Sequence, residues 1–321
     1  MTGPEVRKPP PETSPEILAG APGCPPPWRL WAPPRQLVPL LFSVPHSGDY
    51  YPPDLLAASR LGPLALRRSE DCFVDALFAA APAVGAPLLA ATHARAYVDC
   101  NRAPDDLDPA MFSRPPRPAP RRCPGRAADG LGVIPAIVAP GLTIYRHPLP
   151  YGAATARIAR LHRPYHDKLS QLVATTGQRF GVALLVDCHS MPAEPGTDRR
   201  GADFVIGDCH GASCHPLVGE TLCRALQRMG YSVHRNTPYA GGYITSRYGR
   251  PRAGVHAVQI EIRRALYMDE ARLVRHRGFA RLRRAIGGLL AEMATIDLPA
   301  VAKTPRQDKK RPLRQSEVAQ V

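Results

Sequence analysis

The sequence is short of acidic residues: 27 aspartates and glutamates stand against 42 lysines and arginines, giving a formal net charge of +15. Such an excess attracts nucleic acid without specifying a fold. Part of it is local, in a polar tail from Ala302 to Val321, and the rest is mostly arginine scattered through helical and loop stretches. No RNA- or DNA-binding motif accompanies it, so we do not expect a nucleic-acid partner.

Other signatures are also missing. None of the eight cysteines forms a CxxC pair. No run of about eighteen apolar residues predicts a membrane span, and no apolar stretch with a basic flank predicts a secretory signal. The GxSxG elbow of serine hydrolases is absent as well. We therefore expect a reduced, cytoplasmic setting without a membrane partner.

Proline is abundant instead, with 38 residues that cluster near the N-terminus and between Pro104 and Pro124. Such stretches favour irregular chain. We predict a Pro-rich disordered arm over residues 1–35, a single catalytic domain over 36–298 and a basic disordered tail over 299–321.

Hydrophobic periodicity predicts strands that alternate with helices. The strands are expected at 37–44, 87–92, 96–99, 182–187, 202–207, 232–234 and 255–262, and the helices at 67–81, 153–176 with a kink or restart at Pro164, 216–229 and 270–294. This order is typical of an α/β sheet with helices on both faces.

Polar side chains collect at the ends of these strands, where open α/β sheets bind ligands. They are His46, Asp99, Asn101, Arg102, Asp187 and His189, with Glu261 inside the last strand. Taken singly, each has an ordinary explanation as a loop residue, a helix cap or a surface charge. Two imidazoles and a carboxylate, however, make the three-ligand set of a catalytic zinc site. Such a metal lowers the pKa of water and polarises a carbonyl.

Five ordered motifs carry a family resemblance. They are Pro45-His46-Ser47-Gly48; Asp99-Cys100-Asn101-Arg102; Asp187-Cys188-His189-Ser190; Gly241-Gly242-Tyr243-Ile244-Thr245 with Tyr248-Gly249-Arg250-Pro251; and Gln259-Ile260-Glu261 followed by Tyr267-Met268-Asp269-Glu270. Their order and spacing resemble the N-formylglutamate amidohydrolase family over about residues 37–272. The resemblance implies one Zn²⁺ and a three-layer α/β/α fold with a central mixed, mostly parallel sheet, phosphorylase/hydrolase-like and distantly similar to zinc carboxypeptidases and aminoacylases.

By position in these motifs, His46 and His189 become the zinc imidazoles. The third ligand is open between Asp49, which has HxxD spacing, and Asp71, where the family pattern carries an acid. We prefer Asp71, although an acid there also suits the N-terminus of a helix.

The same resemblance makes Glu261 the general acid/base. Asn101 and Arg102 are similar to the carboxypeptidase pair that grips a substrate α-carboxylate, which suits a planar guanidinium. Arg146 and Arg250 are candidates for the second carboxylate of a glutamyl substrate. Asp187 is a candidate partner of His189, although we expect its side chain to point to the opposite face if the strand continues.

The sequence departs from the family at Arg247, where a histidine is usual, so the reaction class is better supported than the formyl group. The first hypothesis is hydrolysis of N-formyl-L-glutamate to formate and L-glutamate, which the family implies as a step of histidine breakdown. The second is a related N-acyl-amino-acid hydrolase or carboxypeptidase-like enzyme. The third, a degenerate binding protein, is disfavoured because His46, His189, Glu261 and Arg102 are all retained.

Overall fold

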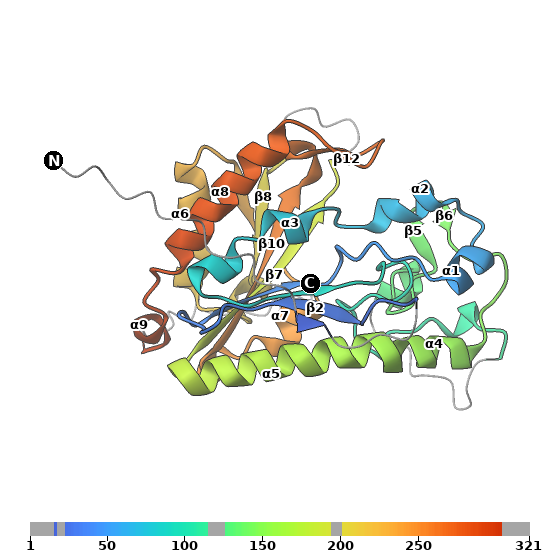
Figure 1. The fold of residues 1–321 in the computed structure, drawn as a ribbon, viewed down its shortest axis with the longest axis horizontal. Coiled ribbons are helices and arrows are strands. Elements are labelled where there is room, and N and C mark those ends of the chain that lie inside the picture. Colours follow the sequence, from blue (N-terminus) through green and yellow to red (C-terminus); the bar gives the residue numbers. More distant parts are fainter. Residues whose placement is uncertain (1–15, 18–22, 115–125, 194–200, 304–321) are drawn as a thin grey trace, which may run out of the picture.

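The computed structural model describes residues 16–17, 23–114, 126–193 and 201–303, and its centre is an eight-stranded sheet (Figure 1). The strand order is β1-β2-β4-β3-β7-β10-β8-β9. The strands are β1 (Glu16–Ile17), β2 (Trp28–Trp31), β3 (Leu40–Val44), β4 (Leu88–Ala91), β7 (Ala183–Met191), β8 (Phe204–Gly207), β9 (Val233–Arg235) and β10 (Val255–Arg263). Strands β4, β3, β7 and β10 run parallel, whereas β2 and β8 run antiparallel to their inner neighbours. The expected mixed, mostly parallel sheet is therefore confirmed.

Helices cover both faces of this sheet, which completes the three predicted layers. The long α5 lies on one face, and α6 and α8 lie on the other (Figure 1). The helices are α1 (Pro53–Ala58), α2 (Pro63–Leu66), α3 (Val74–Leu77), α4 (Tyr151–Arg157), α5 (Arg163–Phe180), α6 (Pro216–Arg228), α7 (Tyr243–Tyr248), α8 (Gly278–Met293) and α9 (Leu298–Lys303). Among the described residues, none of these helices combines the length and apolar character needed to cross a bilayer.

Shorter elements join these layers. Two hairpins lie outside the main sheet: β5 (Ile137–Ala139) with β6 (Leu142–Thr143), and β11 (Met268–Asp269) with β12 (Val274–Arg275). The single helical turns are η1 (Arg67–Ser69), η2 (Ala81–Val84), η3 (Pro109–Met111), η4 (Arg126–Asp129), η6 (Cys209–Gly211), η7 (Pro251–Ala253) and η8 (Arg264–Leu266).

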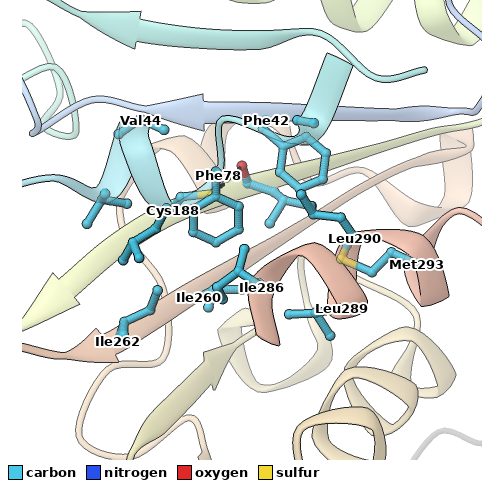
Figure 2. Close-up of a cluster of buried hydrophobic side chains, with 14 of the residues drawn as sticks. Phe42, Val44, Phe78, Cys188, Ile260, Ile262, Ile286, Leu289, Leu290 and Met293 are labelled. Carbon is cyan, nitrogen blue, oxygen red and sulfur yellow. Dashed lines mark hydrogen bonds between the residues drawn. The ribbon is translucent and has the colours of Figure 1, made fainter. Parts of the chain in front are cut away.

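The main core lies between the sheet and α8. Alternate residues of β3, β7 and β10 point toward this helix and pack against its apolar stripe, as Figure 2 shows. The cluster includes Phe42, Val44, Phe78, Cys188, Ile260, Ile262, Ile286, Leu289, Leu290 and Met293. Both faces of β7 and β10 are buried, and the first half of β7, Ala183–Val186, is accordingly a continuous apolar run.

The opposite side chains of β7 build the second core and then the site. Ala183 and Leu185 pack under α5 with Tyr165. Because side chains alternate along a strand, the next residues on this face are Asp187 and His189. Both are buried. On this face of β7, the first residues pack in the core and the later ones, Asp187 and His189, are the polar residues of the site.

The helix predicted over 153–176 is a longer composite rod. It runs through α4, a π-helical turn at Ile158–His162 (η5) and α5. The amide of Arg163 bonds to the carbonyl of Ile158, five residues earlier, so the rod widens just before Pro164. A wide turn accommodates proline, which would otherwise clash with the carbonyl four residues before it.

Two predicted helices and one strand are wrong as continuous elements. The stretch 67–81 is broken into η1, α3 and the start of η2 because Glu70 is extended and Phe73 is left-handed, with φ 65°. The stretch 270–294 begins between the two strands of the β11–β12 hairpin, and its helix starts only at Gly278. The segment 96–99 is a turn in which the amide of Tyr97 bonds to the carbonyl of Ala94.

The predicted arm also needs correction, since Trp28–Trp31 forms β2 and pairs antiparallel with β4. Trp28 and Leu30 are buried and Arg29 is exposed, an alternation that the surrounding prolines masked. In the predicted tail, residues 299–303 belong to α9. The rest of the predicted arm and tail, 1–15, 18–22 and 304–321, lies outside the described residues, as does part of the Pro-rich loop, 115–125.

We expect Ile286→Ala in α8 to lower the free energy of unfolding by about 2–5 kcal/mol, because Ile286 is fully buried and its truncation leaves a cavity. Chemical denaturation measures the loss. Leu217→Ala is the control, since Leu217 is 40% exposed and should change stability by less than about 0.5 kcal/mol. Equal losses in both variants would contradict this assignment of the core.

Candidate metal centre and active site

A cavity of about 1630 Å³ lies at the carboxyl ends of the parallel strands. It is lined by His46, which follows β3, by His189 in β7 and by Glu261 in β10. Residues of the β5–β6 hairpin, including Ile137 and Leu142, give it an apolar wall. This is the position at which open α/β sheets bind their ligands.

Three buried side chains converge at this cavity, and we call His46, Asp71 and His189 the His–Asp group. The Nδ1 atoms of His46 and His189 lie 3.3 and 2.9 Å from the same oxygen, Oδ2 of Asp71. One ligand atom of each residue lies within 4.8 Å of the other two. Donors that share one tetrahedral Zn²⁺ at about 2.0–2.1 Å lie roughly 3.4 Å apart. The donor set and its spacing therefore fit a single small transition-metal ion.

The outer nitrogens of both imidazoles meet carboxylates. Nε2 of His46 lies 2.7 Å from Oδ1 of Asp99, and Nε2 of His189 lies 2.9 Å from Oδ2 of Asp187. A carboxylate that accepts the Nε2 hydrogen leaves the lone pair on Nδ1, the arrangement typical of metal-binding histidines. Our expectation that Asp187 points away from His189 was wrong, because residues two apart in a strand share a face.

Asp71 reaches the group because the helix predicted through it is interrupted. Its amide donates to the carbonyl of His46 at 3.0 Å, and the hydroxyl of Ser47 donates to its carbonyl at 2.8 Å. The alternative, Asp49, is exposed and lines a separate cavity of about 170 Å³. Of the two carboxylates that the sequence left open, the structure brings only Asp71 to the histidines.

Two arginines balance these buried acids. Nη2 of Arg264 lies 3.0 Å from Oδ1 of Asp71, which keeps Oδ2 of Asp71 for the imidazoles. Nη2 of Arg95 lies 2.6 Å from Oδ2 of Asp99. Three carboxylates and two guanidiniums leave one negative charge when both imidazoles are neutral. That excess favours a bound cation.

The electrostatic environment holds the acids in their charged form. Burial would raise the pKa of Asp71, but the hydrogen bonds from His189 and His46 outweigh it and hold the pKa well below its usual range. Burial would likewise raise the pKa of Asp99, but the charge of Arg95 outweighs burial and holds this pKa well below its usual range. For His189, burial lowers the pKa, whereas the Asp187 charge raises it and prevails. A metal must therefore displace a proton from this imidazole.

Glu261 lies beside the His–Asp group. It is the parallel-strand neighbour of His189 in the β7–β10 register, and its side chain is on the same sheet face. Burial raises its pKa to about 7, with the Asp71 charge adding to the effect and the His189 charge opposing it. The Gln259 amide donates to its Oε1 at 2.8 Å. A carboxyl group with a pKa near neutrality can both accept and return a proton at pH 7.

The side-chain amide of Asn101 is engaged by other residues of the protein. Its Nδ2 lies 3.2 Å from Oδ2 of Asp187 and 3.0 Å from Nε2 of His189, and its Oδ1 accepts from the amide of Ile244 at 2.8 Å. A Cβ atom at Gly242 would lie 2.4 Å from Nδ2 of Asn101. This close approach explains the second glycine of the Gly241-Gly242-Tyr243 motif, since any side chain there would displace Asn101.

Arg102 is directed to the cavity. It lines the cavity and is half-buried. Its Nε donates to the carbonyl of Leu131 at 2.8 Å, and its Nη1 donates to the carbonyl of Asn101 at 2.9 Å. The guanidinium is therefore held by two backbone oxygens.

The other predicted arginines are elsewhere. Arg146 and Arg250 are exposed and do not line the cavity; Nε of Arg146 donates to the carbonyl of Ser59. Arg247 is also exposed, and its guanidinium lies over the rings of Tyr243 and Tyr248.

Sequence reasoning gave no role to Arg95, Arg264 and Tyr239. All three line the cavity, and Asp99, noted only as a polar residue at a strand end, proves to be the partner of His46. Arg264 lies three residues after Glu261, and Arg95 lies four before Asp99. Those spacings to motif residues were the available signal.

Comparisons with known proteins agree on one family. The sequence profile described as N-formylglutamate amidohydrolase matches residues 38–268. An N-formylglutamate deformylase from Pseudomonas aeruginosa is 34% identical over 243 residues, covering 74% of this chain and 84% of that protein. Its counterpart from Pseudomonas putida is 34% identical over 241 residues, covering 73% and 83%. The crystal structure of an N-formylglutamate amidohydrolase from Ralstonia eutropha JMP134 superposes with a TM-score of 0.77 at 40% identity, covering 83% of this chain and 96% of that one.

We expect the purified protein to hold about one transition-metal ion per chain, as a single three-donor site implies. His46→Ala, His189→Ala and Asp71→Asn should each lose most of it, because each removes one donor. Elemental analysis after gel filtration measures the content. Asp49→Asn is the matched control and should keep its metal, since Asp49 lies in another cavity. Loss of metal in the control but not in Asp71→Asn would reverse the assignment of the third ligand.

Proposed function

The chain belongs to the N-formylglutamate amidohydrolase family, and from this premise we propose that it hydrolyses N-formyl-L-glutamate to formate and L-glutamate. The observation that carries the proposal is the buried His–Asp group with Glu261 beside it in one cavity. A merely binding role is a poorer explanation, because it gives no use to a three-donor group with Glu261 beside it.

His46, Asp71 and His189 would hold the metal, and the donor set favours Zn²⁺. The ion would supply Lewis acidity, polarising the formyl carbonyl and making a water molecule more acidic. Asp99 and Asp187 would keep both Nδ1 atoms directed at it.

Glu261 is the proton carrier of this proposal. It takes a proton from the attacking water as the new C–O bond forms, and it passes the proton to the amide nitrogen as the C–N bond breaks. The pKa of about 7 suits both transfers. The Gln259 amide, 2.8 Å from Oε1, orients the carboxyl group.

Carboxylate recognition falls to the arginines that line the cavity. We assign the substrate α-carboxylate to Arg102, whose guanidinium is oriented by two backbone carbonyls. The second carboxylate is assigned to the other arginines that line the same cavity, Arg68, Arg95 and Arg126. Arg146 and Arg250, the earlier candidates, do not line it.

We assign the proposed hydrolysis to histidine breakdown in the cytoplasm, in keeping with the family. The seven cysteines in the described part of the chain are all free thiols, as a reducing compartment requires.

We expect Glu261→Gln to fold and bind metal normally while the rate of formate release falls by roughly 10²- to 10⁴-fold, since the amide is isosteric but carries no transferable proton. Formate detection under saturating substrate measures the rate. The control is Glu220→Gln on the surface of α6, which should be unaffected. A near-normal rate in Glu261→Gln would mean that Glu261 is a structural carboxylate.

Arg102→Lys should lower kcat/KM for N-formyl-L-glutamate by roughly 30-fold or more, because a point charge cannot reproduce the guanidinium fork and loss of a buried charge pair costs about 2–5 kcal/mol. The substrate with an amide in place of its α-carboxylate should be poor for the wild type and lose little further. Arg250→Lys is the control. Equal losses on both substrates would remove Arg102 from carboxylate recognition.

A further inference from the structure

One short segment, Asp99–Arg102, joins the metal centre to substrate recognition, and we call it the site loop. Its first residue contacts His46, and the side chain of Asn101 contacts His189. Its last residue, Arg102, carries the guanidinium that lines the cavity. A small displacement of this loop would therefore move the proposed carboxylate anchor relative to the His–Asp group.

The site loop is held from its other side by two imidazoles. Nε2 of His162, in the π-helical turn, lies 2.9 Å from the carbonyl oxygen of Arg102. Nε2 of His166, in α5, lies 2.9 Å from the carbonyl oxygen of Cys100. A carbonyl only accepts, so both nitrogens must carry hydrogen and donate.

Burial keeps both histidines neutral, and the two carbonyls fix which nitrogen carries the hydrogen. They are 2% and 5% exposed. Burial lowers the pKa of His166 to about 3. Burial also lowers the pKa of His162, and the hydrogen bond to the carbonyl of Arg102 does not offset this effect. Each ring is therefore neutral at pH 7 and has one N–H, which the carbonyl requires on Nε2. Nδ1 of His166 is then free to accept from the hydroxyl of Tyr248, 3.0 Å away.

The helical rod supplies these donors at a fixed spacing. His162 and His166 are four residues apart, and their ring centroids lie 4.4 Å apart. The wide turn lets the rod pass Pro164 without ending, so both rings stay on one continuous element, the α4–α5 rod of Figure 1. Between the two carbonyls that they hold lies the carbonyl of Asn101, the acceptor for Nη1 of Arg102.

We propose that His162 and His166 are positioning residues that fix the Arg102 guanidinium for the substrate carboxylate, by donating to the backbone on both sides of Asn101. Neither histidine lines the cavity, so they act through the site loop. The inference rests on the proposed function, which assigns the α-carboxylate to Arg102.

The test compares two substitutions of one residue. His162→Phe keeps a ring of similar size but has no donor, whereas the amide of His162→Gln can still donate. Loss of one such bond should raise KM for N-formyl-L-glutamate about tenfold, with kcat changed less than threefold and metal content unchanged. His162→Gln should restore KM to within about threefold of wild type. In an Arg102→Lys background, His162→Phe should raise KM little further, because the guanidinium that His162 positions is already gone.

A structural readout separates this inference from the proposed function. The amide of Asn101 donates to Oδ1 of Asp99, and the amide of Asp99 donates to the carbonyl of Val133. These amides should exchange with solvent faster in His162→Phe and normally in His162→Gln, whatever substrate the enzyme uses. The control is His215→Phe, at the N-terminus of α6, which should lower the melting temperature without changing KM or this exchange.

Three outcomes are distinct. Wild-type enzyme that does not release formate sinks the proposed function alone, and the exchange experiment still decides the inference. Unchanged KM and unchanged exchange in His162→Phe would overturn the inference while leaving the hydrolase intact. Equal KM increases in the phenylalanine and glutamine variants would also overturn it, since the donated hydrogen would then be irrelevant.

Discussion

The compensation of buried charge is the constraint on which the site depends. Asp71, Asp99 and Asp187 are at most 1% exposed, and an ionised carboxylate without partners is too costly to keep in such a place. Each is matched by imidazole nitrogens, by Arg95 or by Arg264. The broken helix around Asp71 and the turn before Asp99 deliver these acids to their partners. These local breaks in secondary structure thus allow each buried acid to reach partners that are distant in the sequence.

Much of the sheet could be predicted because its signal is local. The apolar run at the start of β7 reflects burial on both faces, and the family motifs place His46, His189 and Glu261 at one edge of the sheet. The helix expected through Asp71 was wrong because its apolar spacing is helical while its backbone is held by the carbonyl of His46. Periodicity contains no information about such a contact.

The arginines show the limit of sequence reasoning most clearly. Arg250 lies in a family motif, yet both it and Arg146 are exposed and away from the cavity, whereas Arg95 and Arg264 bond directly to the acids of the site. An arginine has a long side chain and no periodic signature, so its partner is decided by tertiary contacts. In a chain with many arginines, membership in a motif does not by itself indicate a role in the site.

The hairpin β5–β6 gives the cavity its apolar wall but belongs to no part of the buried charge network. It lies outside the main sheet, and none of the His–Asp group, Glu261 or the site loop is on it. Substitutions at Ile137 or Leu142 can therefore reshape the cavity while the acids and their partners stay in place. The shape of the cavity is therefore separable from the charge network that holds the His–Asp group, and one can change while the other is kept.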